Sequence, residues 1–163
     1  MARDDDEAGL IALIGDVFTE YDGCVLDVDG EMPELRGIAT WFAAHDGRFW
    51  VAESETGAVV GCVGIAPAAT EPGGAELKKF YVAKDWRAIG VGRALWEHVL
   101  AAAREREARF MDLWSDTRFQ TAHAWYERKG FVRGPTTRDL HDKSQSVEFY
   151  FRLDLGTVLT CCV

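Results

Sequence analysis

A glycine-rich turn is the segment of this sequence with the clearest chemical potential. It reads "RAIGVG", Arg87 to Gly92, and lies between a strand expected to end near Val82 and a helix expected to begin near Gly90. The first amides of a helix have no partner within the helix, and the helix dipole favours an anion beside them. Gly90 and Gly92 lack a Cβ, so a phosphate can approach the backbone, and Arg87 can add a charge-assisted hydrogen bond. The turn therefore predicts a pyrophosphate site, with a ligand-free glycine-rich turn as the alternative.

Two other phosphate-binding motifs do not fit this turn. A dinucleotide fingerprint requires a third glycine where Leu95 stands, and a Walker loop requires Gly-Lys-Ser/Thr, which the sequence lacks.

The elements before the turn follow from hydrophobic spacing. Apolar residues recur every three or four positions in residues 6–21, which predicts an amphipathic helix, and Pro33 suits the first turn of a second helix. The runs "RFWVAE" and "AVVGCVGIA" flank "SETG", which predicts a β-hairpin.

Elements on both sides of the turn alternate between strand and helix. Residues 75–82 predict a strand whose alternation breaks near Lys79 and Phe80, where a β-bulge fits. A helix is expected over 91–106 and a buried strand over 109–115. A strand, a helix and a further strand in this order indicate one parallel pair with a right-handed crossover.

The last third of the chain predicts a helix followed by two strands. Thr117 and Gln120 fit a capping box that opens a helix to Lys129, with Gly130 as its left-handed terminator. Apolar residues alternate over 147–153, which is typical of a strand. The whole order predicts an α/β (α+β) fold, with a mixed sheet covered by helices.

Charge limits the classes of partner. The chain has 163 residues with 18 basic and 27 acidic side chains, so its net charge is −9. This balance disfavours nucleic acid and anionic membranes as partners and mildly favours an amine acceptor, although solubility alone would also explain it.

Cysteine spacing gives no sign of a metal site, and hydropathy gives no sign of a membrane span. The four cysteines show no metal-ligand spacing and no CxxC pair. No apolar stretch approaches the ~18–20 residues of a membrane span, and the first residues do not resemble a signal peptide. A cytoplasmic location is the default expectation.

Two motifs carry a family resemblance. The run "AELKKFYVAKDWRAIGVGRALWEHVL" resembles motif A of the GNAT (GCN5-related) N-acetyltransferases, with Arg87, Gly90 and Gly92 at the signature positions. The run "AHAWYERKGF" resembles the end of motif B and supplies the four residues Tyr126, Glu127, Gly130 and Phe131. The resemblance covers roughly residues 8–153.

The resemblance implies a single GNAT domain over residues 1–155, followed by a tail at 156–163. Its sheet would be mixed and mostly antiparallel, with helices on both faces and a splayed cleft between the family's fourth and fifth strands, here 75–82 and 109–115. The usual first strand would be missing, because the chain begins almost at the first helix, unless the true start lies upstream. The family's common Asn near the motif B helix is replaced in the region of Phe119 and Gln120.

Acetyl-CoA is the co-substrate that the resemblance implies, without a metal. The backbone of Phe80, Tyr81 and Val82 would pair with the pantetheine arm, and the Val82 amide would polarise the thioester carbonyl. The pyrophosphate would lie on the amides of six residues with one arginine just beyond: Arg87, Ala88, Ile89, Gly90, Val91 and Gly92, then Arg93.

Acetyl transfer to an amine also needs a base and an acid. An alkyl amine is mostly protonated at neutral pH, so a group must remove a proton. Glu76 is the expected base and Tyr126 the expected acid for the leaving thiolate, in a direct transfer within a ternary complex. A surface Glu76 facing Lys78 and a core Tyr126 beside Trp125 are the alternatives, and His123 is expected at the surface.

The function expected is acetyl transfer to an amine of a small molecule or a peptide. An acyl-CoA-binding regulatory module without turnover is the alternative, and a nucleotide- or phosphate-binding α/β protein is a third reading. The acidic loop with Asp22, Asp27, Asp29 and Glu31 would either receive a cationic acceptor or be a solvated loop. A homodimer formed through exposed strand edges stays open.

Overall fold

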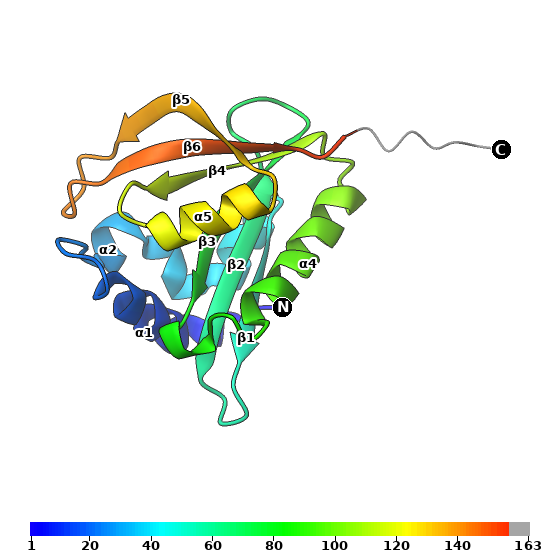
Figure 1. Cartoon of the computed structure of the whole chain (residues 1–163). Helices are drawn as coiled ribbons and strands as arrows, with labels where there is room; N and C mark the ends of the chain where they lie inside the picture. Colours follow the sequence, from blue (N-terminus) through cyan, green and yellow to red (C-terminus); the bar gives the residue numbers. More distant parts are fainter. Residues whose placement is uncertain (157–163) are drawn as a thin grey trace.

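The fold is built on one six-stranded sheet with the strand order β1-β2-β3-β4-β6-β5 (Figure 1). The computed structural model describes residues 1–156, so the predicted tail at 156–163 lies outside this range except for Gly156. The strands are β1 (Arg48–Glu53), β2 (Val59–Pro67), β3 (Gly74–Val82), β4 (Phe110–Asp116), β5 (Val132–Asp139) and β6 (Val147–Asp154). The helices are α1 (Glu7–Phe18), α2 (Val28–Glu31), α3 (Ile38–Ala44), α4 (Val91–Glu105) and α5 (Gln120–Arg128), with short 3-10 turns η1 (Asp4–Asp6), η2 (Pro33–Gly37) and η3 (Lys84–Trp86).

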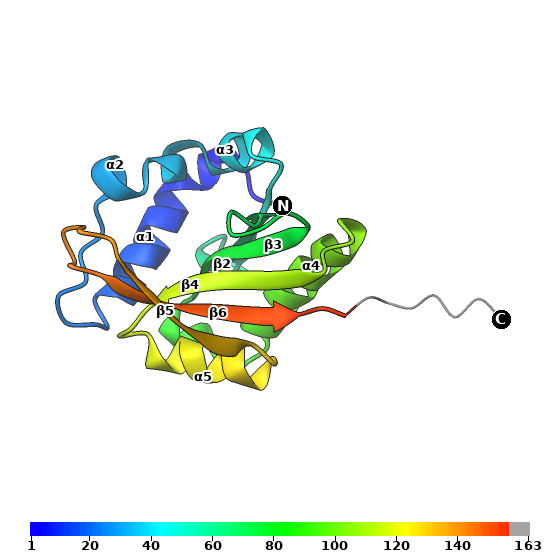
Figure 2. The ribbon, with the colours of Figure 1, turned by 90° about the horizontal axis from the view of Figure 1, so that it is seen from above.

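Helices cover both faces of the sheet, as Figure 2 shows. α4 and α5 pack on one face, where Leu95 and Val99 of α4 join a buried cluster with the strands. α1 and α3 pack on the other face, where Leu10 and Phe42 join a second cluster. Almost all residues of β2 and β4 are therefore buried, and the two helical layers confirm the predicted mixed α/β fold.

The parallel strands β3 and β4 separate along their length. Their pairing is confined to Gly74↔Phe110, Ala75↔Met111 and Glu76↔Asp112. Beyond Glu76, β3 pairs only with β2, whereas β4 continues beside β6. Because the two strands share only three residue pairs, the edge of β3 that faces β4 has no strand partner over its second half among residues 1–156. This separation is the splayed arrangement that the family resemblance implies.

A β-bulge lies in β3 at the predicted position. The pairing of β2 with β3 shifts between Cys62 and Gly64, and Lys79 has a φ of 50°. The Cys62 thiol donates to the carbonyl oxygen of Lys79 at 3.2 Å. The extra residue restores the alternation, so that Phe80 packs with the α4–α5 cluster and Tyr81 with the α1–α3 cluster.

Two local predictions need correction. The capping box at Thr117 and Gln120 is wrong: α5 begins at Gln120, Phe119 is its N-cap, and no side chain caps it. The turn is instead held by Asp116, whose Oδ1 accepts from the Arg118 amide at 2.9 Å. The second helix is divided into η2 and α3, and the expected loop before it contains the short α2. Gly130 ends α5 with a φ of 94°, as predicted.

Candidate active site

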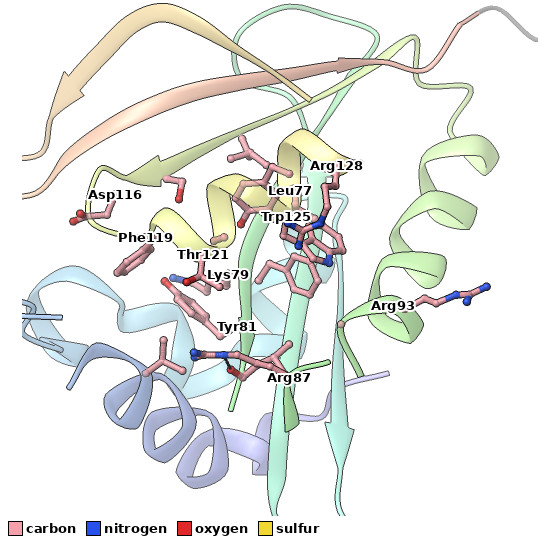
Figure 3. A pocket seen from close by; sticks show the side chains of 18 of the residues that line it. Leu77, Lys79, Tyr81, Arg87, Arg93, Asp116, Phe119, Thr121, Trp125 and Arg128 are labelled. Carbon is pink, nitrogen blue, oxygen red and sulfur yellow. Dashed lines mark hydrogen bonds between the residues drawn. The ribbon is translucent and has the colours of Figure 1, made fainter. Parts of the chain in front are cut away.

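A cleft of about 650 Å³ opens where β3 and β4 separate (Figure 3). Its walls come from the second half of β3, the end of β4, the turn before α4 and one side of α5, with single residues of α1 and β6. The turn and α5 are the two segments that carry the motifs in the sequence, so the fold brings both motifs to one cavity.

The turn before α4 presents a row of free backbone amides. Gly90 is the N-cap of α4 with a φ of 104°, and Ala88 has a φ of 62°, so the chain turns left-handed twice before the helix. The first bond into the helix joins the Ala94 amide to the carbonyl of Gly90 at 2.9 Å. Within residues 1–156, the amides of residues 88–93 have neither a backbone nor a side-chain acceptor, and α4 has no acidic residue in its first turn. The arrangement favours an anion, because the helix dipole and the free N–H groups act together.

Arg87 does not contribute to this row. Its amide donates to the carbonyl of Lys84 at 3.3 Å, so the free amides begin at Ala88. Its side chain is also engaged, because Nε donates to the Val82 carbonyl at 2.9 Å and the two terminal nitrogens bind Glu20 at 2.6 and 2.8 Å. The guanidinium therefore joins α1 to the end of β3 and is not directed at the predicted pyrophosphate.

Two other arginines lie near the cleft. Arg93 points away from it in Figure 3, its side chain is 78 % exposed, and it pairs with Glu97 at 3.0 Å. Arg128, at the end of α5, lines the cleft, and no motif in the sequence singled it out.

The free edge of β3 runs along the cleft. Tyr81 and Val82 are opposite Cys62 and Gly61 of β2, which leaves their other side open. The Ala83 amide donates to the carbonyl of Val60 at 2.9 Å. Because successive amides of a strand point in opposite directions, the Val82 amide points away from β2, toward the cleft. An extended ligand can therefore pair with β3 here as an added strand would.

Tyr126 lies in the wall of the cleft that α5 forms. It is 6 % exposed and contacts the rings of Phe131 and Phe151 at 5.8 Å between centroids. Burial raises the pKa of Tyr126, so the phenol keeps its proton at neutral pH. Its neighbour Trp125 packs edge-on against Phe80, with 4.9 Å between the ring centroids, and joins α5 to β3.

Glu76 lies at the closed end of the splayed strands. It is opposite Asp112 in the last residue pair between β3 and β4, and Lys78 Nζ contacts its Oε1 at 2.8 Å. Glu76 is 9 % exposed and is absent from the cleft lining. The structure thus brings Tyr126, but not Glu76, to the cleft. Asp112 is buried beside it, and burial raises the pKa of Asp112.

Sequence reasoning missed two carboxylates that do line the cleft, Asp116 and Glu148. Burial acts to raise the pKa of Asp116, but hydrogen bonds and the charge of Arg118 outweigh it and lower that pKa. The Glu148 side chain is 15 % exposed and accepts from Arg138 Nε at 2.6 Å. Burial raises the pKa of Glu148, and Arg138 compensates only in part. The alternation over 147–153 places Glu148 opposite the core-facing Phe149, but sequence alone does not say what faces it.

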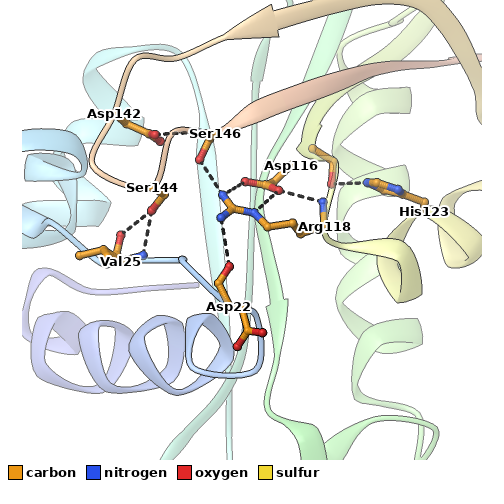
Figure 4. A network of polar contacts seen from close by, with 9 residues as sticks. Asp22, Val25, Asp116, Arg118, His123, Asp142, Ser144 and Ser146 are labelled. Carbon is orange, nitrogen blue, oxygen red and sulfur yellow. Dashed lines mark hydrogen bonds and ion pairs between the residues drawn. The ribbon is translucent and has the colours of Figure 1, made fainter.

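A polar network connects Asp116, in the lining of the cleft, to the loop after α1 (Figure 4). Arg118 binds both carboxylate oxygens of Asp116 and donates to the Asp22 carbonyl, at 3.4 Å, in the loop after α1. The Ser144 hydroxyl, before β6, accepts from the Val25 amide at 2.8 Å. The loop between α1 and α2 is therefore fastened to the hairpin of β5 and β6.

His123 is buried, which corrects its expected place at the surface. It is 8 % exposed, its Nε2 lies 3.1 Å from the Ser115 hydroxyl, and the rings of Phe149 and Phe151 contact it. Burial lowers the pKa of His123, so its imidazole is neutral at pH 7. The surface prediction failed because this side of α5 packs against Phe149 and Phe151 of β6.

Two of the four acidic loop residues are paired with basic side chains. Asp27 contacts Lys143 at 2.5 Å, and Asp29 contacts Arg36 at 2.8 Å. No group of three or more His, Cys, Asp or Glu that could hold a metal occurs in the part of the chain described, and none of its helices has the length and apolar character needed to cross a membrane.

Comparison with known families identifies the family to which this chain belongs. The model of the acetyltransferase (GNAT) domain matches residues 45–133, which run from before β1 to the start of β5 and include the free amides and Tyr126. The chain belongs to the GNAT acetyltransferase family. The separated strands β3 and β4, the turn before α4 and α5 all lie within the matched residues.

Individual relatives agree with this family. The probable N-acetyltransferase camello of Xenopus tropicalis is 33 % identical over 117 residues, which cover 64 % of this chain and 53 % of that protein. The chain thus matches about half the length of this curated relative.

Solved GNAT structures share the fold. A GNAT-family acetyltransferase of Staphylococcus aureus Mu50 aligns with a TM-score of 0.73 at 23 % identity, over 90 % of this chain and 92 % of that one. The ribosomal-protein-alanine N-acetyltransferase of Brucella melitensis aligns with a TM-score of 0.70 at 21 % identity, over 94 % and 97 %. A streptothricin acetyltransferase candidate from Bacillus anthracis, solved with acetyl coenzyme A, aligns with a TM-score of 0.54 at 24 % identity, over 65 % and 61 %.

Proposed function

We propose that this GNAT protein transfers an acetyl group from acetyl-CoA to an amine of a small molecule or a peptide, by direct transfer in a ternary complex. The observation that carries the proposal is the row of unpaired amides from Ala88 to Arg93 at the head of α4, next to the free edge of β3. A diphosphate on a pantetheine arm requires both features side by side.

These two features support acetyl-CoA as the co-substrate. The amides of residues 88–93 would hold the pyrophosphate, and Arg128 at the edge of the cleft can add positive charge. The backbone of Phe80 to Val82 would pair with the pantetheine arm. The structure of the Bacillus anthracis protein with acetyl coenzyme A supports this choice of co-substrate within the same fold.

Two groups in the cleft suit the chemistry of the thioester. The Val82 amide points into the cleft and would donate to the carbonyl oxygen as negative charge develops there, an interaction worth ~3–4 kcal/mol in comparable sites. Tyr126 keeps its proton and would donate it to the leaving sulfur, whose conjugate thiol has a pKa of about 8.5. The role of Glu76 as base stays a prediction, because its carboxylate is bound by Lys78 at the closed end of the strands.

A melting experiment with CoA tests the binding half of this proposal. Ligand at 100 times its dissociation constant stabilises a fold by ~2.7 kcal/mol, which is a clear shift in Tm. Gly92→Trp should abolish the shift, because a large side chain would fill the approach to the free amides. Ala101→Trp, on the exposed side of the same helix, is the matched control and should keep the shift. A shift that survives Gly92→Trp would show that CoA binds elsewhere.

A thiol-release assay with a panel of amines tests the catalytic half. Release of CoA that depends on one of the amines supports the enzyme and names its acceptor. CoA-induced stabilisation without release across the panel would instead support a regulatory acyl-CoA-binding module. Stabilisation by ATP or NAD but not by CoA would support a nucleotide-binding protein.

A further inference from the structure

We propose that Glu148 is the general base of the reaction, taking the proton from the acceptor's nitrogen, with Arg138 as the residue that positions it. The inference rests on the N-acetyltransferase function proposed above and deepens it.

The position of Glu148 is the first observation. Two acidic residues line the cleft within residues 1–156, and they are opposite each other on neighbouring strands: Asp116 at the end of β4 and Glu148 at the start of β6. Tyr81, Val82 and Tyr126 line the same cleft as Glu148, and the charge of Glu148 adds to the burial that raises the pKa of Tyr81. Glu148 is therefore within electrostatic range of the residues at the gap between β3 and β4, where the thioester is expected.

The bonding of each carboxylate is the second observation. Asp116 accepts three hydrogen bonds from Arg118, two from its guanidinium and one from its amide, and its lowered pKa makes it a poor base. Within residues 1–156, Glu148 accepts one side-chain bond, from Arg138 to Oε2, and its other oxygen accepts none. Because burial raises the pKa of Glu148 toward the working pH, this carboxylate is the better proton acceptor.

Aromatic side chains lie beside Glu148 on its face of the sheet. The Arg138 guanidinium lies over the Trp114 ring, 4.5 Å from its centroid, and donates to Glu148 Oε2 at 2.6 Å. Trp114 also lines the cleft and contacts the Tyr150 ring at 5.1 Å. An acceptor amine can thus approach Glu148 along an aromatic wall, on the face of the sheet opposite α5.

Protons balance in this scheme. A neutral amine attacks the thioester carbonyl, the C–N bond forms and the C–S bond breaks, and the nitrogen gives one proton to Glu148. The departing sulfur takes one proton from Tyr126. Glu148 then returns its proton through water to the Tyr126 phenolate. An acceptor that arrives as an ammonium ion first loses one proton to solvent.

The dependence of kcat on pH should follow the protonation of the Glu148 carboxylate. The titratable and charged groups that face Glu148 are Arg138 on β5, Asp116 on β4 with its partner Arg118, Tyr81 on β3, and Asp142 in the turn between β5 and β6. Arg138 is the neighbour that lowers the pKa of Glu148. Removing the charge of Arg138 should therefore move the acid limb of kcat against pH to higher pH.

The test measures kcat and KM from pH 5 to 9 with acetyl-CoA and the best amine from the panel. Glu148→Gln should reduce kcat about 10²-fold or more and abolish the acid limb. Arg138→Gln should keep the limb but shift it upward, a result that a merely structural role would not produce. Glu105→Gln is the matched control, because this exposed glutamate also pairs with an arginine, Arg48, but lies outside the cleft. It should match the wild type.

Each other result is informative. If the wild type releases no thiol with any amine, the proposed function fails. If the wild type is active and Glu148→Gln retains its rate and acid limb, or if Glu76→Gln removes the limb instead, only the assignment of Glu148 is overturned. Should Glu148→Gln lose the CoA-induced melting shift through misfolding, Arg138→Gln decides alone, and an unmoved limb contradicts the proposal.

Discussion

Arg87 and Glu20 form a two-point ion pair that joins the end of α1 to the turn before α4. Both terminal nitrogens of Arg87 contact Glu20, and Nε binds the carbonyl of Val82. The side chains are 29 % and 21 % exposed. One arginine therefore links the helix on one face of the sheet to the strand edge at which the thioester is expected, so its position bears on both stability and catalysis.

Breaking this pair should destabilise the fold. Glu20→Ala leaves the Arg87 guanidinium partly buried with one acceptor, and we expect a loss of ~1–3 kcal/mol, or about 2–10 °C in Tm. The control is Glu97→Ala, which removes the exposed pair with Arg93 and should cost less than about 0.5 kcal/mol. Equal effects of the two variants would show that the buried pair contributes no more than a surface one.

The left-handed residue Gly90 should be required for binding CoA more than for folding. Gly90→Ala places a Cβ at a φ of 104°, which costs ~1–2 kcal/mol and tilts the free amides. Gly57→Ala is matched, because Gly57 has a φ of 83° in the hairpin between β1 and β2, and an added Cβ meets nothing within 4 Å at either site. Both variants should melt earlier, but only Gly90→Ala should weaken CoA-induced stabilisation. A similar weakening in Gly57→Ala would remove the special role of the turn.

Tyr126→Phe should separate chemistry from binding. The hydroxyl would act on the leaving sulfur alone, so we expect kcat to fall at least about 10-fold while the CoA-induced melting shift stays unchanged. Steady-state kinetics and melting curves measured on the same preparation check this. An unchanged kcat would remove the acid role, and a lost melting shift would indicate that the phenol mainly supports binding or packing.

The buried His123 should make the fold acid-sensitive. Its pKa is lowered in the folded state, so the unfolded chain binds a proton first as pH falls below the ordinary value of 6.5. The free energy of unfolding then decreases with falling pH until the folded imidazole is also protonated. Urea titrations between pH 7.5 and 5 should show a steeper loss for the wild type than for His123→Gln. Parallel curves would contradict the burial of a neutral imidazole.

Much of the fold could be predicted because its signals are local. The turn at Gly90, the break in alternation at Lys79 and the terminator at Gly130 each depend on the conformation of a few neighbouring residues. The capping box at Thr117 failed although it is also local, because the Asp116 carboxylate bound the Arg118 amide and guanidinium instead. A stronger ion pair thus replaced a weaker cap.

The parts of the site that sequence missed depend on contacts between distant segments. Arg87 was assigned to a phosphate because its partner Glu20 lies 67 positions away. Glu148 could be recognised as a site residue only from the pairing of β6 with β4, which places it opposite Asp116. His123 was judged by its polarity, whereas the packing of α5 on β6 decided its burial. In each case the residue type was evident and its neighbour was not.

An amide NMR titration of the isotope-labelled protein with CoA and, separately, with pantetheine tests the proposed pyrophosphate site directly. If the unpaired N–H groups bind the pyrophosphate, the amides of residues 88–93 should show the largest chemical shift changes with CoA. The changes should be small with pantetheine, which lacks the diphosphate. Unchanged signals for these six residues at saturating CoA, with large chemical shift changes elsewhere, would contradict pyrophosphate binding at this turn.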